Sequence, residues 1–165
     1  MAGVQSEPRL AYMTTTAKTY TFPVDVRWIA GRLTRATATG KPDLAVATPP
    51  EFKKGIPGVW SPEDLLVASA AACFAVTLLA VAERREVPVH SLHVAGRGRV
   101  GQRPEGSFGF TEIELGVQLE TFPGHEDEAR DAAEAAERGC LIAASLDVPI
   151  RLELEVSAVP LAAAR

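Results

Sequence analysis

The sequence predicts one α+β domain in which a mostly antiparallel sheet packs against a long central helix and a second helix. Six stretches have the apolar content and period of strands. Two further stretches are long enough for helices: one is almost wholly apolar, and the other is charged with an alanine-rich face. Their order along the chain, β-β-β-α-β-β-α-β, is typical of an α+β domain.

Length and composition restrict the protein class. The chain has 165 residues, which suits one globular domain, and we expect a loose N-terminal tail over residues 1–17 and a single domain over residues 18–160. With 47% hydrophobic and 23% charged residues, the composition excludes a disordered or collagen-like chain. The net charge of -4 argues against binding to nucleic acid or to an anionic membrane surface.

Three strands are expected before the long helix, over Thr19–Ile29, Leu33–Ala38 and Asp43–Thr48. In the first, alternate residues place apolar side chains on one face: Tyr20, Phe22, Val24, Val26 and Trp28. Gly31 and the segment Gly40-Lys41-Pro42 allow the two turns, and the prolines and glycines of residues 49–58 indicate an irregular loop.

The long helix has a clear beginning and end. Ser61 can cap free N–H groups, Pro62 suits the first turn, and the acidic Glu63 and Asp64 face the positive end of the helix dipole. The helix should end near Glu86, because a proline at position 88 disfavours helical geometry in the residue before it.

The middle of this helix is apolar from Leu65 to Ala82 except at Ser69 and Thr77. Its length approaches the roughly 18–20 residues that span a membrane. It is built largely of alanine, and charged residues precede and follow it. We therefore expect a buried central helix and no membrane partner. Residues 1–17 are polar and lack the apolar stretch of a secretory signal, so we expect a cytoplasmic protein.

The second half continues with two strands, a helix, a short helical stretch and a last strand: Val89–Arg99, Phe108–Thr121, Glu126–Arg138, Cys140–Leu146 and Pro149–Val156. A turn through Gly101, Pro104 and Gly106 should join the first two of these strands.

Two apparent ligand motifs fail a physical test. Residues 96–101 match the dinucleotide fingerprint G-x-G-x-x-G, but no helix can begin there to bind a pyrophosphate. His90 and His93 are three apart on a strand and point to opposite faces, and His125 stands alone. We predict neither a cofactor nor a metal site.

The two cysteines are the candidate reactive groups. Cys73 lies on the long helix, where a lone thiol is most often an inert part of the core. Cys140 follows Gly139 at the start of a helical turn, where free N–H groups favour a thiolate. Two cysteines are too few for a secreted disulfide framework or a zinc site of thiolates.

The run S-P-E-D-L-L at residues 61–66, followed by A-A-A-C-F at residues 70–74, resembles the N-P-E-x-L…A-A-C-F signature of the OsmC/Ohr family. These are the osmotically inducible and organic hydroperoxide resistance proteins. Ala30-Gly31-Arg32 is similar to the family's Gly-Gly-Arg turn, and Pro50-Glu51-Phe52 to its Pro-x-Glu-Leu. The chain departs from the family pattern at Ser61, which replaces asparagine, and after Cys140, where leucine replaces proline.

The resemblance, which covers about residues 19–159, implies an OsmC-like fold, an intertwined homodimer and a thiol-dependent peroxidase that reduces organic hydroperoxides to alcohols. By position, Cys73 resembles the peroxidatic cysteine and Cys140 the resolving cysteine of a Cys73–Cys140 disulfide. Arg32 takes the place of the arginine that stabilises the thiolate, and Glu63 that of its glutamate partner. The implied reductant is an external dithiol, for example of lipoyl type.

Spacing constrains this site. Glu63 and Cys73 are ten residues apart, or about 15 Å along a straight helix. The helix could break near Ser69, Arg32 could bridge the gap, or a partner subunit could supply the carboxylate. A cysteine this far from its helix start should have a raised pKa and need a cation, for which Arg27 and Arg35 are alternatives to Arg32.

Two other functions fit the same residues. The chain could form a dimer of this fold whose cysteines do not turn over and whose apolar pocket binds a small ligand, or it could be a thiol redox sensor or a purely structural dimer. The Leu141-Ile142 departure favours the binding dimer. Phe52, Trp60 and Phe74 could form the apolar walls of a substrate site, although ordinary core packing explains them equally well.

Overall fold

The computed structural model describes residues 18–159; the predicted tail over residues 1–17 and the predicted last domain residue, 160, lie outside the described residues. The elements follow the predicted order, including the short helical stretch expected after the second helix: β1 (Asp25–Ala30), β2 (Leu33–Thr37), β3 (Leu44–Ala47), α1 (Pro62–Arg84), β4 (Ser91–Gln102), β5 (Phe108–Thr121), α2 (Glu126–Gly139), α3 (Leu141–Ser145) and β6 (Ile150–Ala158). The α+β class is confirmed.

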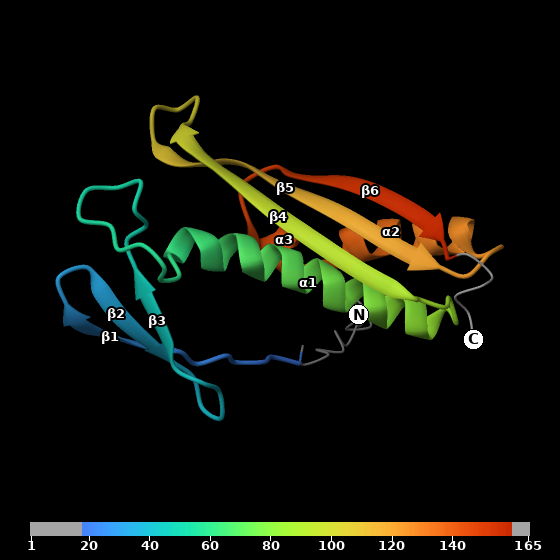
Figure 1. The fold of residues 1–165 in the computed structure, drawn as a ribbon, viewed down its shortest axis with the longest axis horizontal. Coiled ribbons are helices and arrows are strands. Elements are labelled where there is room, and N and C mark those ends of the chain that lie inside the picture. Colours follow the sequence, from blue (N-terminus) through green and yellow to red (C-terminus); the bar gives the residue numbers. More distant parts are fainter. Residues whose placement is uncertain (1–17, 160–165) are drawn as a thin grey trace, which may run out of the picture.

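The strands form two three-stranded sheets rather than one (Figure 1). The first, β1-β2-β3, is antiparallel throughout. In the second, β4-β5-β6, the first pair is antiparallel and β6 runs parallel to β5. A parallel pair needs a long crossover connection, and helices α2 and α3 provide it here.

The first strand is shorter than predicted, because it begins at Asp25 instead of Thr19. Pro23 lies in the missing part and has no N–H to donate. Within residues 18–159, no strand pairs with residues 19–24. Gly101 was expected in a turn but lies inside β4. This strand continues to Gln102, which pairs with Phe108 at the start of β5.

A capping box fixes the start of α1, as the sequence predicts. The Ser61 hydroxyl accepts a hydrogen bond from the Asp64 N–H at 3.0 Å, and the Asp64 carboxylate accepts one from the Ser61 N–H at 2.9 Å. The helix then continues unbroken to Arg84. The break near Ser69 that would have brought Glu63 close to Cys73 does not occur.

The core lies between the β4-β5-β6 sheet and the two longer helices. Helix α1 packs against α2, β4 and α3, and α2 also packs against β5 and β6. The α2 face is made of alanines, which allow the helix to approach closely: Ala129, Ala132, Ala133 and Ala136. The buried apolar residues of α1 and β5 complete this core: Ala70, Phe74, Leu78, Val81, Ala82, Ile113, Leu115, Val117 and Leu119.

Helix α1 is covered on one side only. It is long and apolar enough to cross a membrane, with a mean hydropathy of 2.5 over 18 residues, of which 28% are buried within the chain. Val76 remains 63% exposed and Leu79 is also exposed. The expectation of a buried central helix is therefore met only on the side that faces the sheet and α2.

The β1-β2-β3 sheet joins the rest of the chain through β3. The Ala47 N–H donates a hydrogen bond to the Trp60 carbonyl at 2.9 Å, just before α1 begins. Every residue of β1 is exposed, and Trp28 has 73% of its surface in solvent. In Figure 1 this sheet lies beside the first turns of α1, away from α2 and β6.

Candidate active site

The two cysteine side chains interact with each other. Cys73 projects from the middle of α1, while Cys140 ends α2 and immediately precedes α3. Both are free thiols, and Cys140 is buried whereas Cys73 is half-buried. The Cys140 thiol donates a hydrogen bond to the Cys73 sulfur. The fold therefore brings together the pair that the sequence predicts.

The pKa of Cys73 is lowered, although burial alone would raise it. Hydrogen bonds to the sulfur outweigh the burial, and the Ile142 N–H makes the largest of these contributions. The Cys140 thiol, the Thr77 hydroxyl and the Leu141 N–H contribute in the same direction. The start of α3 therefore supplies donors to a cysteine that lies deep within another helix.

The pKa of Cys140 is raised, first by burial and then by its hydrogen bond and charge interaction with Cys73. The N–H groups of Ala143 and Ile142 offset only part of this. Both predicted directions were thus wrong: the pKa of Cys73 is lowered and that of Cys140 is raised. The physical reason is that N–H groups of α3 reach the Cys73 sulfur and outweigh its burial, whereas burial dominates at Cys140.

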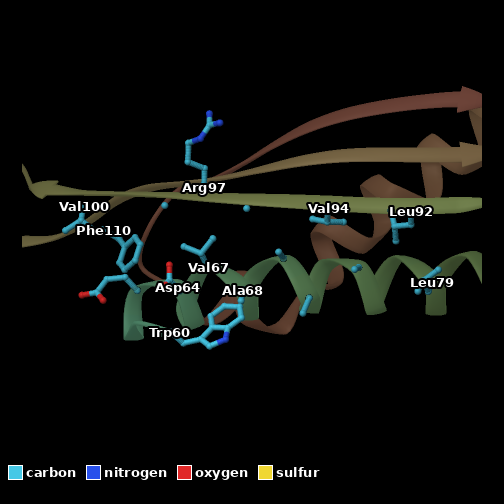
Figure 2. A pocket seen from close by; sticks show the side chains of 16 residues that line it. Trp60, Asp64, Val67, Ala68, Leu79, Leu92, Val94, Arg97, Val100 and Phe110 are labelled. Carbon is cyan, nitrogen blue, oxygen red and sulfur yellow. The ribbon is translucent and has the colours of Figure 1, made fainter. Parts of the chain in front are cut away.

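Glu63 has an unsatisfied carboxylate oxygen. Its Oε2 atom is buried and has no hydrogen-bond partner within residues 18–159. The side chain lines a groove of about 810 Å³ between α1 and β4, together with Trp60, Val67 and Phe110 among others (Figure 2). A buried polar oxygen without a partner is costly, so its position invites a donor from outside this part of the chain.

Close approach of β4 to α1 shapes this groove. A Cβ atom on Gly98 would lie 2.5 Å from Phe110 Cε1, and one on Gly96 would lie 2.7 Å from Val67 Cγ1. Figure 2 shows Val67 projecting toward the strand and Arg97 pointing away from the groove. The groove does not reach Cys73, which lies at least about 100° around the helix axis from the lining alanines of α1.

Arg32 lies on the other sheet, at the exposed turn between β1 and β2. Among the residues that the structure describes, it forms no ion pair, whereas Arg35 pairs with Asp43 at 3.7 Å. Arg27 lies opposite Arg35 in the sheet register. One chain thus brings Cys73 and Cys140 together but leaves Arg32 on a separate sheet and Glu63 about 15 Å along an unbroken helix.

The three aromatic residues that were expected to line a substrate site also lie in different parts of the structure. Phe74 is buried and lines a cavity of about 210 Å³ beside Cys140, together with Ile150 and Leu152 among others. Trp60 lines the α1–β4 groove, and Phe52 makes an edge-to-face contact with Phe108 at 6.4 Å between ring centroids. Only Phe74 therefore lies near the thiols.

The two rejected ligand motifs lie at β4, with His93 inside the strand and His90 just before its first residue, Ser91, rather than on the strand as predicted. Residues 96–101 are strand residues of β4, with no helix beginning there. Over the described range 18–159, no group of three or more His, Cys, Asp or Glu side chains is arranged to hold a metal ion.

A comparison with known protein families matches residues 55–155 to the OsmC-like proteins. The chain belongs to the OsmC-like protein family. The matched range runs from the loop before α1 into β6 and contains both cysteines and Glu63, but not Arg32. A search of curated proteins finds no match to this OsmC-like protein.

Solved structures share the fold. An OsmC-like protein of unknown function from Vibrio cholerae superposes with a TM-score of 0.76 at 17% identity, covering 84% of this chain and 99% of its own. An organic hydroperoxide resistance protein from Elizabethkingia anophelis superposes with a TM-score of 0.67 at 23% identity, covering 86% of this chain and 97% of its own. An organic hydroperoxide resistance protein from Bacillus subtilis superposes with a TM-score of 0.60 at 24% identity, covering 82% of this chain and 98% of its own. These superpositions establish a common fold.

Three groups that act on Cys73 were not predicted from the sequence. The N–H groups of Leu141 and Ile142 carry no side-chain signal, so only the fold could reveal them. Thr77 could have been found, because it lies four residues after Cys73 in an otherwise apolar stretch. Side chains at this spacing are neighbours on a helix surface.

Proposed function

We propose that this OsmC-like protein is a homodimeric thiol peroxidase that reduces organic hydroperoxides to alcohols. The observation that carries the proposal is the contact between two thiols whose pKa values are displaced in opposite directions. Attack on a peroxide needs a thiolate, and resolution needs a second thiol within reach. The lowered pKa of Cys73 favours its thiolate, and Cys140 is the second thiol within reach.

The reaction follows from these roles. The Cys73 thiolate attacks the terminal oxygen of the hydroperoxide, the O–O bond breaks, and an alkoxide leaves and takes up a proton to give the alcohol. Cys73 is then a sulfenic acid. The Cys140 sulfur attacks the Cys73 sulfur, water leaves, and a disulfide remains. An external dithiol, for example of lipoyl type, reduces this disulfide to two thiols and is itself oxidised to a disulfide.

Arg32 and Glu63 join this site through the contact between two subunits. Within residues 18–159, Glu63 has a buried oxygen without a hydrogen-bond donor and Arg32 has a guanidinium without an ion-pair partner. A guanidinium can bind a carboxylate through two hydrogen bonds and still face a thiolate. Because one chain does not bring Arg32, Glu63 and Cys73 together, we assign their meeting to the subunit interface.

The distribution of apolar surface and charge supports the dimer. Apolar side chains are exposed on β1, on the segment before it and on α1, including Phe22, Trp28 and Val76. Residues 18–60 contain seven Lys or Arg and three Asp or Glu, whereas residues 61–159 contain eight and seventeen. A basic sheet of one copy therefore complements the acidic body of another.

This interface is testable by sedimentation equilibrium at micromolar concentration. We expect a dimer, because α1 has an apolar face that its own chain leaves uncovered. A stable monomer of 165 residues would contradict both the dimer and the shared site. The same interface would cover the exposed apolar face of α1, so that the helix needs no membrane. We therefore propose a cytoplasmic protein that binds neither lipid nor nucleic acid.

The peroxidase itself is tested by titrating the reduced protein with cumene hydroperoxide and counting thiols. We expect the wild-type protein to lose both thiols quickly and to form a Cys73–Cys140 disulfide detectable by mass spectrometry. Cys73→Ser should abolish hydroperoxide reduction. Cys140→Ser should react once and accumulate Cys73 as sulfenic and then sulfinic acid, because no nearby thiol traps the first product.

The titration also separates the other functions. If the wild-type thiols do not react with the hydroperoxide, the peroxidase is excluded and a binding dimer remains. If both thiols react once but no dithiol restores them, the protein is a redox sensor rather than an enzyme. Substantial turnover by the Cys73→Ser protein would transfer the nucleophile to another residue.

A further inference from the structure

Thr77 is a polar residue in the apolar stretch of α1 that the proposed reaction does not use. The other polar residue there, Ser69, donates its hydroxyl to the Leu66 carbonyl at 2.8 Å. Ser145 likewise donates to the Leu141 carbonyl of its own helix at 2.8 Å. Such bonds satisfy a helical hydroxyl locally. The Thr77 hydroxyl instead interacts with the Cys73 sulfur.

Helix geometry places Thr77 beside Cys73. The two residues are four apart on an unbroken helix, so their side chains share a face. The methyl group of Thr77 faces the end of α2, since a Cβ atom on Gly139 would lie 3.6 Å from Thr77 Cγ2. Because χ1 moves the methyl and hydroxyl groups together, this contact helps to direct the hydroxyl toward Cys73.

We propose that Thr77 is a positioning residue for Cys73: its hydroxyl donates a hydrogen bond to the thiolate and holds the sulfur toward Cys140. The proposal rests on the proposed function for its consequence in turnover, but the interaction itself requires no peroxide. A hydroxyl donor stabilises the negative sulfur more than the neutral thiol. Loss of the hydroxyl should therefore lower the thiolate population.

The surroundings of Cys73 make such a neutral donor important. The groups that act on its sulfur come from α1, from the junction of α2 with α3, and from α3 itself: Thr77, Cys140, Leu141 and Ile142. Of these, only Cys140 is titratable, and none is a lysine or an arginine. Glu137 borders the neighbouring cavity on the Cys140 side. Within one chain, the thiolate therefore depends on hydrogen-bond donors without a positive charge.

A pair of substitutions separates the hydroxyl from the methyl group. Thr77→Val keeps the shape and the Gly139 contact but removes the donor, whereas Thr77→Ser keeps the donor and removes the methyl group. The measurement is the pH dependence of Cys73 alkylation by iodoacetamide, resolved by peptide mass spectrometry, in a Cys140→Ser background. Ser69→Ala is the matched control, because that hydroxyl bonds to a carbonyl and lies outside the thiol site.

We expect Thr77→Val to shift the alkylation profile to higher pH and to lower the rate at neutral pH roughly two- to tenfold, as the loss of one hydrogen bond implies. Thr77→Ser should restore the profile, and Ser69→Ala should leave it unchanged. An unshifted Thr77→Val profile would overturn the proposal. So would a Thr77→Ser profile shifted as far as that of Thr77→Val, because the residue would then act through its methyl packing.

The result is independent of the peroxidase test. If the wild-type protein fails to reduce cumene hydroperoxide but Thr77→Val still shifts the alkylation profile, the positioning role stands and the proposed function falls. If the wild-type protein turns over and Thr77→Val alters neither the profile nor the rate of Cys73 oxidation, the positioning role falls and the function stands.

Discussion

The two sheets of this protein differ in whether their apolar side chains are buried within the chain. The β4-β5-β6 sheet buries one face under α1 and α2, while its other face carries ion pairs such as Arg151 with Glu112 at 2.6 Å. Within residues 18–159, no helix covers the β1-β2-β3 sheet, which exposes Val26 and Trp28 on one face of β1. The β4-β5-β6 sheet completes its core within one chain, and the β1-β2-β3 sheet does not.

The division of the sheets matches the division of the candidate site. The completed core holds Cys73 and Cys140 in contact and supplies the N–H groups of α3. The incomplete sheet carries Arg32, while Glu63 lies near the junction of the two regions, in the first turn of α1. We infer that one chain is sufficient to prepare the thiol pair, whereas the charged groups are completed by association.

Stability measurements should show the largest difference between the two regions. Phe74 is 1% exposed, and Phe74→Ala should lower the free energy of unfolding by about 3–5 kcal/mol, because it leaves a cavity in the core. Trp28→Ala removes a larger side chain but should cost less than about 0.5 kcal/mol within a single chain, because Trp28 lies mostly in solvent. Denaturant unfolding checks both values.

Protein concentration provides the control for this comparison. If Trp28 lies in a dimer interface, the effect of Trp28→Ala on the unfolding midpoint should grow with protein concentration, since association stabilises the folded state. A large loss that does not depend on concentration would place Trp28 in the core of its own chain and remove the contrast between the sheets.

Substitution of arginine tests the next largest effect. We expect Arg32→Met to lower the Cys73 thiolate population at neutral pH about tenfold, which corresponds to about 1.4 kcal/mol. Arg35→Met should have little effect, because Arg35 already pairs with Asp43. The rate of Cys73 alkylation as a function of pH measures both, in a Cys140→Ser background. A larger effect from Arg27→Met would transfer the role to that residue.

Mixed dimers distinguish the source of the arginine. An Arg32→Met subunit retains Cys73, and a Cys73→Ser subunit retains Arg32. If Arg32 acts across the interface, mixing the two should restore one working site in each mixed dimer. Mixing should restore nothing if Arg32 serves the cysteine of its own chain, in which case the division of the site between subunits is wrong.

Elements with local signals were predictable from the sequence. The start of α1 follows from Ser61, Pro62 and Asp64, and β5 was predicted with its observed bounds because its apolar residues alternate along the strand. The contact of Cys73 with Cys140 was predicted only through the family resemblance. Their spacing alone left both as possible core thiols.

The pKa directions could not be read from the sequence. Cys73 lies deep in α1, and the donors that lower its pKa are backbone groups of α3, which only the tertiary fold brings near. The division into two sheets was missed for a similar reason. Strand period shows that a segment is extended, but it does not show which segments pair. Whether Arg32 joins the site depends on how a second copy binds, and the strand pattern of one chain gives no information on that contact.

A smaller effect than that of Arg32→Met is expected at the junction of the two regions. Ser61 caps α1 directly after Trp60, which binds β3, and two residues before Glu63. Ser61→Ala removes the capping hydroxyl and should lower the free energy of unfolding by about 1 kcal/mol. Ser61→Asn, which restores the residue of the family signature, should stay within about 0.5 kcal/mol of the wild type because asparagine also caps. Denaturant unfolding measures both, and alkylation of Cys73 should remain unchanged, because three turns of α1 separate the cap from the thiol pair. If Ser61→Ala altered Cys73 reactivity as much as stability, the first turn of α1 and the thiol pair would be coupled within one chain, and the two regions would not be independent.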